Sequence, residues 1–108
     1  MRIDKDLVAA SATPLVLAIL AEGESYGYAI LKRVRALSDG ELEWTDGMLY
    51  PVLHRLENQG LIKACWRTAE NGRKRKYYSL KASGRAVLEK QREQWRVVNL
   101  TLEQIWGT

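Results

Sequence analysis

The sequence predicts a mainly α-helical fold with one small β-hairpin. Apolar residues recur at helical spacing in three segments before residue 60, alternate with period two between residues 62 and 80, and return to helical spacing over 82–106. Three helices, a hairpin and a trailing helix are the element order of a winged helix-turn-helix with an added helix. At 108 residues, we expect a winged helix over 1–81 and a C-terminal dimerisation helix over 82–108, packed as one compact unit.

Composition narrows the class of protein. Hydrophobic residues make up 46% of the chain, with only two prolines, as in a folded globular domain. The net charge of +4 is uneven, because residues 63–76 contain six basic residues and one acidic residue. Such a local basic patch favours a polyanionic partner. The lone Cys65 excludes an internal disulfide, and no apolar run is long enough to span a membrane, so we expect a cytoplasmic protein without a membrane partner.

The first helix is expected to be the central one. Thr13 followed by Pro14 reads as the N-cap and first residue of a helix that continues to about Glu22, and the run that follows is apolar nearly all round. Residues 4–11 are predicted as a separate short helix or arm. Gly23 is expected to end the central helix.

The second helix is predicted over Tyr26–Leu37, with Ser25 as its cap. Four residues, at positions 30, 31, 34 and 37, are expected to face inward because their spacing is helical. The turn at residues 38–40 follows, and Leu42 to Thr45 could form a short strand.

The stretch from Thr45 to Ile62 contains the third helix, around which the chain is organised. Thr45 or Asp46 can cap its first backbone N–H groups, Pro51 is expected in its first turn, and Gly60 is placed to end it. Its apolar face consists of Leu49, Val52, Leu53 and Leu56.

The opposite face of this helix carries small, aromatic and polar residues. Gly47, Tyr50, Pro51 and His54 would suit a helix in a DNA major groove. The alternative is an ordinary amphipathic helix with a solvated outer face.

The hairpin and the last helix complete the pattern. Ile62, Ala64 and Trp66 are expected on one face of a strand, and Asn71-Gly72 is a strong hairpin turn signal. The last helix is predicted over Ala82–Trp106. Its seam needs a partner surface, which predicts a homodimer; the seam consists of Leu88, Gln91, Trp95, Val98, Leu102 and Ile105.

Three motifs in order resemble the PadR family of transcriptional regulators: YGYAILKRV, GMLYPVLHRLENQGLI and GRKRKYYSLKASGRAVL. The single long C-terminal helix looks like the compact subgroup, and the tryptophan at position 95 is similar to that of its multidrug-binding regulators. The resemblance implies a homodimeric repressor that binds inverted-repeat operators in double-stranded DNA and is released by a ligand. One departure is Lys81, a poor N-cap where the family has Thr, with Ser83 as the alternative cap.

The helix and the hairpin together indicate DNA contact. The expected contacts from the helix face the major groove, and the cations of the hairpin are expected to bind phosphates. The alternative for those cations is a solvated charge run that protects the hairpin edge from aggregation. The expected DNA-binding residues are Thr45, Gly47, Tyr50, Pro51, His54, Arg55, Arg73, Lys74, Arg75 and Lys76.

Trp95 has two interpretations. A large aromatic residue on the seam of a dimerising helix is often core, but Trp95 and its dimer mate could also sandwich a small aromatic effector. The resemblance to multidrug-binding regulators favours the second, with Leu7, Val98 and Leu102 as walls. Asn99 stands where those relatives have an acidic residue, so a preference for cations is not expected.

An enzyme is not expected. The sequence has no Gly-rich phosphate loop, no metal-ligand cluster and no nucleophile–histidine signature, and His54 is its single histidine. We therefore expect no metal and no cofactor. The remaining alternative is a winged helix that docks another protein without specific DNA binding, because the fold alone does not determine function.

Overall fold

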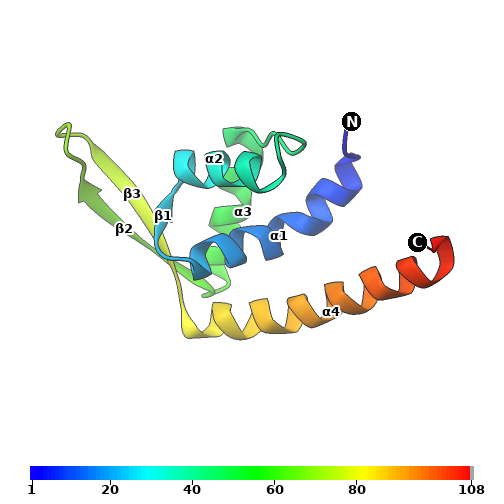
Figure 1. Cartoon of the computed structure of the whole chain (residues 1–108). Helices are drawn as coiled ribbons and strands as arrows, with labels where there is room; N and C mark the ends of the chain where they lie inside the picture. Colours follow the sequence, from blue (N-terminus) through cyan, green and yellow to red (C-terminus); the bar gives the residue numbers. More distant parts are fainter. Residues whose placement is uncertain (108) are drawn as a thin grey trace.

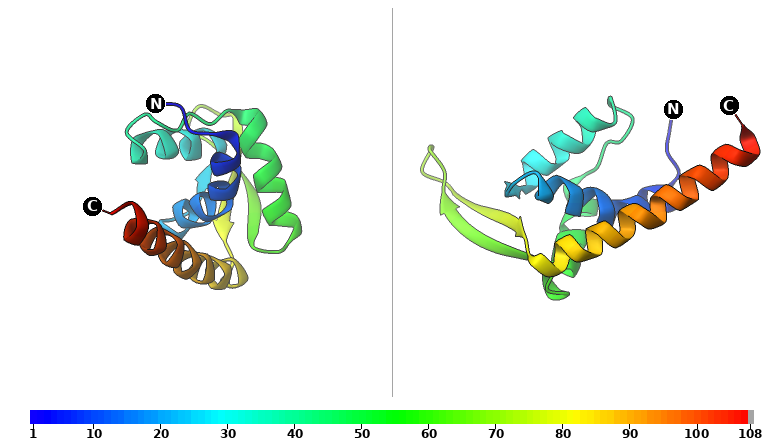
Figure 2. Two further views of the ribbon diagram at one scale, coloured as in Figure 1. Left: turned by 90° about the vertical axis from the view of Figure 1, so that its right-hand side faces the viewer. Right: turned by 60° about the horizontal axis from the view of Figure 1, so that its bottom comes forward.

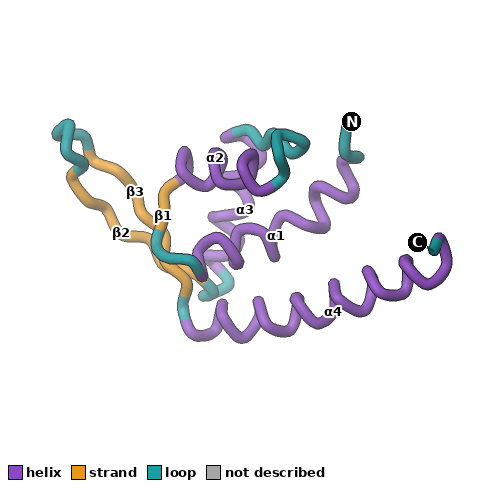
Figure 3. Tube along the Cα trace, in the orientation of Figure 1, coloured by secondary structure: helices purple, strands orange, loops and turns teal. Residues whose placement is uncertain are grey.

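The computed structural model describes residues 1–107 and contains four helices and a three-stranded antiparallel sheet (Figure 1). Thr108, the last residue of the expected C-terminal helix segment, lies outside the described residues. The strand order is β1-β3-β2, and helices and strands follow one another as Figure 3 shows. The elements are α1 (Lys5–Ala21), β1 (Ser25–Tyr26), α2 (Gly27–Leu37), α3 (Asp46–Asn58), β2 (Ile62–Thr68), β3 (Lys74–Leu80) and α4 (Ala82–Trp106).

The core lies around α1, which contacts α2, α3, α4 and β3 (Figure 2). Each neighbour buries a stripe of apolar side chains against it, so α1 is the central helix that its apolar composition predicts. The predicted fold class, a mainly α-helical winged helix with a long C-terminal helix, is confirmed. The core residues with the least exposure are Val16, Leu17, Ile30, Val34, Leu49, Leu53, Leu56 and Ile62.

The N-terminal prediction is wrong in one respect, because α1 is a single helix with Pro14 inside it. Asp4, not Thr13, precedes its first residue. A proline in a helix removes the hydrogen bond to the carbonyl four residues earlier, here that of Ala10. Burial of Ala12 before Pro14 and of Val16 after it holds both halves against the core and offsets that loss.

The second prediction that fails concerns the start of α2. Ser25 does not cap a helix but belongs to β1, which pairs with β3 in the register Ser25↔Tyr78 and Tyr26↔Tyr77. Residues 42–45 form no strand, because β1 already occupies the edge of β3 that is not paired with β2. Leu37, expected to face inward, is 52% exposed at the last residue of α2.

The prediction for α3 is largely confirmed. The Thr45 hydroxyl accepts a hydrogen bond from the Met48 N–H at 3.3 Å, and Gly60 follows the helix with φ +73°. Leu49, Val52, Leu53 and Leu56 are all buried. Pro51 is misplaced by the prediction, because the helix begins at Asp46 and Pro51 therefore lies in the second turn.

The hairpin forms as predicted, and its turn uses Asn71-Gly72. The Asn71 side-chain oxygen accepts a hydrogen bond from the Arg73 N–H at 3.0 Å, and Gly72 has φ +82°. Trp66 was expected to lie inward with Ile62, but it is 64% exposed, because this part of the hairpin projects beyond the core (Figure 1).

The last helix has the predicted bounds, Ala82–Trp106, but its start is held in another way. The Ser83 hydroxyl does not cap the helix and instead donates to the Gly60 carbonyl at 2.6 Å. The Lys81 N–H donates to the Leu61 carbonyl at 3.0 Å. Gly84 is buried against the same carbonyl, so α4 starts on the turn that ends α3.

We expect Gly84→Ala to destabilise the fold. A Cβ at this position would lie 2.1 Å from the Leu61 carbonyl oxygen, a backbone atom that cannot move independently. Overpacking of this kind typically costs about 1–3 kcal/mol. Urea unfolding measures the change, with Gly47→Ala as the control, because the nearest atom to a Cβ there is 3.9 Å away. Equal stability of the two variants would contradict the close contact at Gly84.

Candidate nucleic-acid interface

The outer face of α3 is an exposed strip of small, aromatic and polar side chains. Gly47, Tyr50, Pro51 and His54 are all exposed. Their spacing places them on one side of the helix, because residues three and four apart are neighbours on a helix surface. The structure therefore brings these four predicted residues together on a surface that the core does not use.

Tyr50 is positioned by a glycine that sequence reasoning missed. Gly27, the first residue of α2, is buried, and a Cβ on it would lie 2.5 Å from the Tyr50 hydroxyl oxygen. The absence of a side chain at Gly27 thus leaves room for the phenol ring. The only sequence signal was the glycine between two tyrosines in the YGY motif.

Two of the predicted residues on α3 have partners within the chain. Arg55 donates from its guanidinium to the Thr13 hydroxyl at 2.7 Å, which ties α3 to α1. The Thr45 hydroxyl is occupied as the helix cap. Both lie at the edge of the exposed strip rather than within it.

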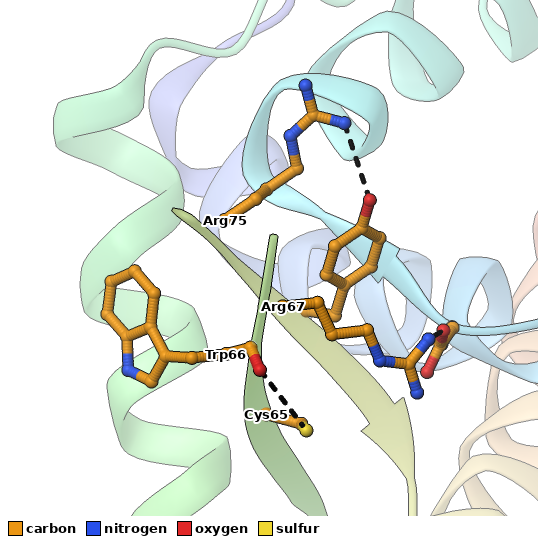
Figure 4. Close-up of polar contacts among 6 residues, drawn as sticks. Cys65, Trp66, Arg67 and Arg75 are labelled. Atoms are coloured by element: carbon orange, nitrogen blue, oxygen red, sulfur yellow. Dashed lines mark hydrogen bonds and ion pairs between the residues drawn. The ribbon is translucent and has the colours of Figure 1, made fainter. Parts of the chain in front are cut away.

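The four consecutive cations of the hairpin lie in different environments. Arg73 is in the turn and Lys74 begins β3, and both are exposed. Lys76 forms an ion pair with Glu57 of α3 at 3.8 Å. The Arg75 guanidinium lies over the Tyr26 ring, 4.0 Å from its centroid, and donates to the Tyr77 hydroxyl at 3.4 Å (Figure 4).

A hollow of about 450 Å³ lies between the hairpin and the starts of α2 and α3. Aromatic rings and cations form its rim, a combination that suits the sugars and phosphates of a nucleic acid backbone. Two of its aromatic residues, Tyr28 and Trp66, were absent from the predicted interface. The lining residues are Tyr26, Gly27, Tyr28, Tyr50, Trp66, Lys74, Arg75 and Lys76.

Tyr78 closes the base of this region. It is buried against the core, and burial, followed by the charges of Glu57 and Tyr50, raises the pKa of its hydroxyl. The hydroxyl therefore stays neutral well into the alkaline range. Tyr78 supports the interface as packing rather than as a charged group.

A second hollow of about 900 Å³ lies between α1 and α4. Of the residues predicted to bind an aromatic ligand, Leu7, Trp95 and Asn99 line it, whereas Val98 and Leu102 are not part of its wall. Its charged rim is paired within α4, with Arg92 on Glu89 at 3.4 Å and Arg96 on Glu93 at 2.6 Å. The hydrogen bond from Arg96 lowers the pKa of Glu93.

Other kinds of site find little support in the described chain. Within residues 1–107, three or more His, Cys, Asp or Glu side chains do not gather anywhere in a way that could hold a metal ion. None of the helices over the same residues is long and apolar enough to cross a membrane.

Comparison with known proteins identifies the family. Residues 16–90 match the transcriptional regulator PadR-like family. A transcriptional regulator from Clostridium thermocellum superposes with a TM-score of 0.85 at 28% identity, covering 94% of this chain and 96% of the other. A PadR family transcription regulator from Clostridium difficile R20291 gives a TM-score of 0.79 at 31% identity, covering 90% and 99%.

A curated relative extends this result. The transcriptional regulator YqjI of Escherichia coli (strain K12) is 33% identical over 84 residues, which are 78% of this chain but only 39% of YqjI. The similarity therefore concerns the winged helix and its surroundings rather than the whole of that relative. With its fold, its motifs and these matches in agreement, the chain belongs to the PadR-like family of transcriptional regulators.

Proposed function

We propose that this protein is a homodimeric repressor that binds an inverted-repeat operator and releases it when a planar aromatic ligand binds. The observation that carries the proposal is the exposed strip of α3 beside a cationic hairpin. In a winged helix, such a helix enters the major groove while the hairpin contacts the adjacent backbone.

The two parts of the interface would have different tasks. Tyr50 and His54 on α3 are placed to meet base edges or the sugar–phosphate backbone in the groove, with Gly47 and Pro51 allowing close approach. Arg73 and Lys74 are exposed and would bind phosphates. Phosphate contacts supply affinity and salt dependence, whereas base contacts supply sequence preference.

A second copy of the chain would cover α4. The helix has 25 residues and is therefore about 37 Å long, but of its side chains only Leu88 is a buried apolar one. Pairing of two such helices about a two-fold axis would place the two α3 helices about 34–36 Å apart, as an inverted repeat with one-turn spacing requires. The exposed apolar residues of α4 are Val97, Val98, Leu100, Ile105 and Trp106.

The hollow between α1 and α4 would receive the ligand. Trp95 lines it, and a planar indole with few rotamers suits stacking on a flat aromatic compound. The partner's copy of α4 would close the open side. Because Asn99 is neutral and the acidic groups of Glu89 and Glu93 are paired with arginines, a preference for cationic ligands is not expected.

The first prediction tests DNA binding. Operator fragments selected from random duplexes should bind the protein better than random sequence at moderate salt. The double variant Arg73→Ala, Lys74→Ala should lower the slope of log affinity against log salt by about 2, since each phosphate contact contributes about 0.9. The double variant Lys5→Ala, Lys90→Ala removes the same charge away from the hairpin and should leave the slope unchanged. A protein that binds no duplex better than random DNA would overturn the proposal, and a stoichiometric protein partner would then favour the docking module.

The second prediction concerns the space that Gly27 leaves for Tyr50. Gly27→Ala should displace the phenol ring and weaken operator binding about as much as Tyr50→Ala, because a Cβ would lie 2.5 Å from the hydroxyl oxygen. In the double variant the second change should have little further effect, since the group to be displaced is already gone. A double-mutant cycle on operator affinity measures this coupling, and additive losses would contradict it.

The third prediction separates the two interpretations of Trp95. The wild-type protein should sediment as a dimer, and Trp95→Ala should remain dimeric while losing both the binding of planar aromatic compounds and the ligand-induced release of DNA. Ligand coupling of this kind is typically about 1–3 kcal/mol. If the variant keeps both properties, Trp95 serves only as packing. If it becomes monomeric, Trp95 belongs to the dimer core.

A further inference from the structure

The register of the β2–β3 hairpin divides its side chains between two faces. Successive residues of a strand point to opposite sides, and directly paired residues share a side. We call them the α3 face and the β1 face after the elements they meet. The α3 face carries the pairs Ile62–Leu80, Ala64–Tyr78, Trp66–Lys76 and Thr68–Lys74, and the β1 face carries Lys63–Ser79, Cys65–Tyr77 and Arg67–Arg75.

The β1 face is engaged inside the molecule. The rings of Tyr26 and Tyr77 meet edge to face, with centroids 5.4 Å apart at 67°. Arg75 lies over Tyr26 at 4.0 Å, and Arg67 lies over Tyr77 at 5.4 Å and also pairs with Glu24. Stacking of guanidinium groups on aromatic faces is favourable and fixes both partners. This cluster therefore attaches the hairpin to β1.

The outer part of the α3 face is open. Trp66 is 64% exposed, whereas Trp44, in the loop before α3, is only 7% exposed. Figure 4 shows Trp66 on the side of the hairpin toward α3 and Arg67 and Arg75 on the other side. Trp66 also lines the hollow that contains Tyr50, and its cross-strand neighbour Lys76 pairs with Glu57 of α3.

An exposed indole between two DNA-binding elements has a specific use. A tryptophan exposed to water forgoes the stabilisation that burial of its ring would give. Placed between α3 and the cationic end of the hairpin, it would be covered when a duplex occupies both elements. Deoxyribose presents apolar C–H groups between phosphates, which suits the face of an indole, while Lys74 on the same face is available for the phosphate.

We propose that the two faces have separate roles, with Trp66 packing against the deoxyribose of the bound duplex while Arg75 is a positioning residue that holds the hairpin to β1 rather than a phosphate contact. This inference rests on the proposed DNA binding and assigns residues within it. It adds an uncharged contact to the interface and removes one cation from the set that meets phosphate.

Trp66 is tested by paired substitutions. Trp66→Ala should weaken operator binding roughly tenfold, because truncation of a well-covered aromatic residue is among the more costly interface changes, and Trp66→Phe should retain most of the affinity. The salt slope should not change in either variant, since no charge is removed. Thermal unfolding should also be unchanged, because the side chain is mostly exposed. Tryptophan fluorescence should change on DNA binding in the wild type and much less in Trp66→Phe.

Arg75 is tested against Lys74, its neighbour on the other face. Lys74→Gln should lower the salt slope by about 1, as expected for a lost phosphate contact. Arg75→Gln removes the same charge but keeps a planar group over Tyr26, so it should leave the slope unchanged and retain more affinity than Arg75→Ala. Hydrogen exchange in β2 and β3 should become faster in Arg75→Ala and not in Lys74→Gln.

Each result has a definite reading. Full affinity in Trp66→Ala, or a loss of affinity accompanied by a lower unfolding temperature, overturns the sugar contact. A salt slope that falls in Arg75→Gln as it does in Lys74→Gln overturns the positioning role. Wild-type protein that binds no duplex rejects the proposed function itself, whereas wild-type binding with failed variant tests rejects only this inference.

Discussion

The arrangement of the molecule depends on a small backbone junction between the end of α3 and the start of α4. The carbonyls of Gly60 and Leu61 accept hydrogen bonds from the Ser83 hydroxyl and the Lys81 N–H at 2.6 and 3.0 Å. Gly84 lies against the same turn with no space for a side chain. Because these bonds join backbone to the first turn of α4, the direction of α4 is tied to the end of α3 rather than to a flexible linker.

This junction has a consequence for regulation by a ligand. In the proposed dimer, the pairing of two α4 helices sets the separation of the two α3 helices, since each α4 starts on the turn that ends its own α3. A ligand between α1 and α4 acts on the other side of the same helix. A compound that favours a different angle of α4 would therefore also favour a different α3 separation, and linkage requires that DNA and ligand then weaken each other's binding.

The sequence predicts elements well where one local signal is sufficient. Four leucine and valine positions and a Thr cap determine α3, Asn71-Gly72 determines the hairpin, and both predictions hold. The failures have tertiary causes. Burial on both sides of Pro14 keeps α1 continuous, and pairing with β3 turns Ser25 from an expected helix cap into a strand residue.

The candidate site follows the same division. Its α3 strip is readable from helical spacing, but the roles of Gly27 and Arg55 are not, because each depends on a contact with another element. Gly27 makes room for Tyr50 of α3, and Arg55 bonds to Thr13 at a separation of 42 residues. The exposed strip itself contains Gly47 and Pro51, neither of which favours a helix interior. Pro51 cannot donate to the Gly47 carbonyl, so α3 is maintained by burial of Leu49, Leu53 and their neighbours rather than by local propensity. A helix held in this way leaves its outer face free for residues chosen for contact, and the violation of local preference there is itself a mark of a functional surface.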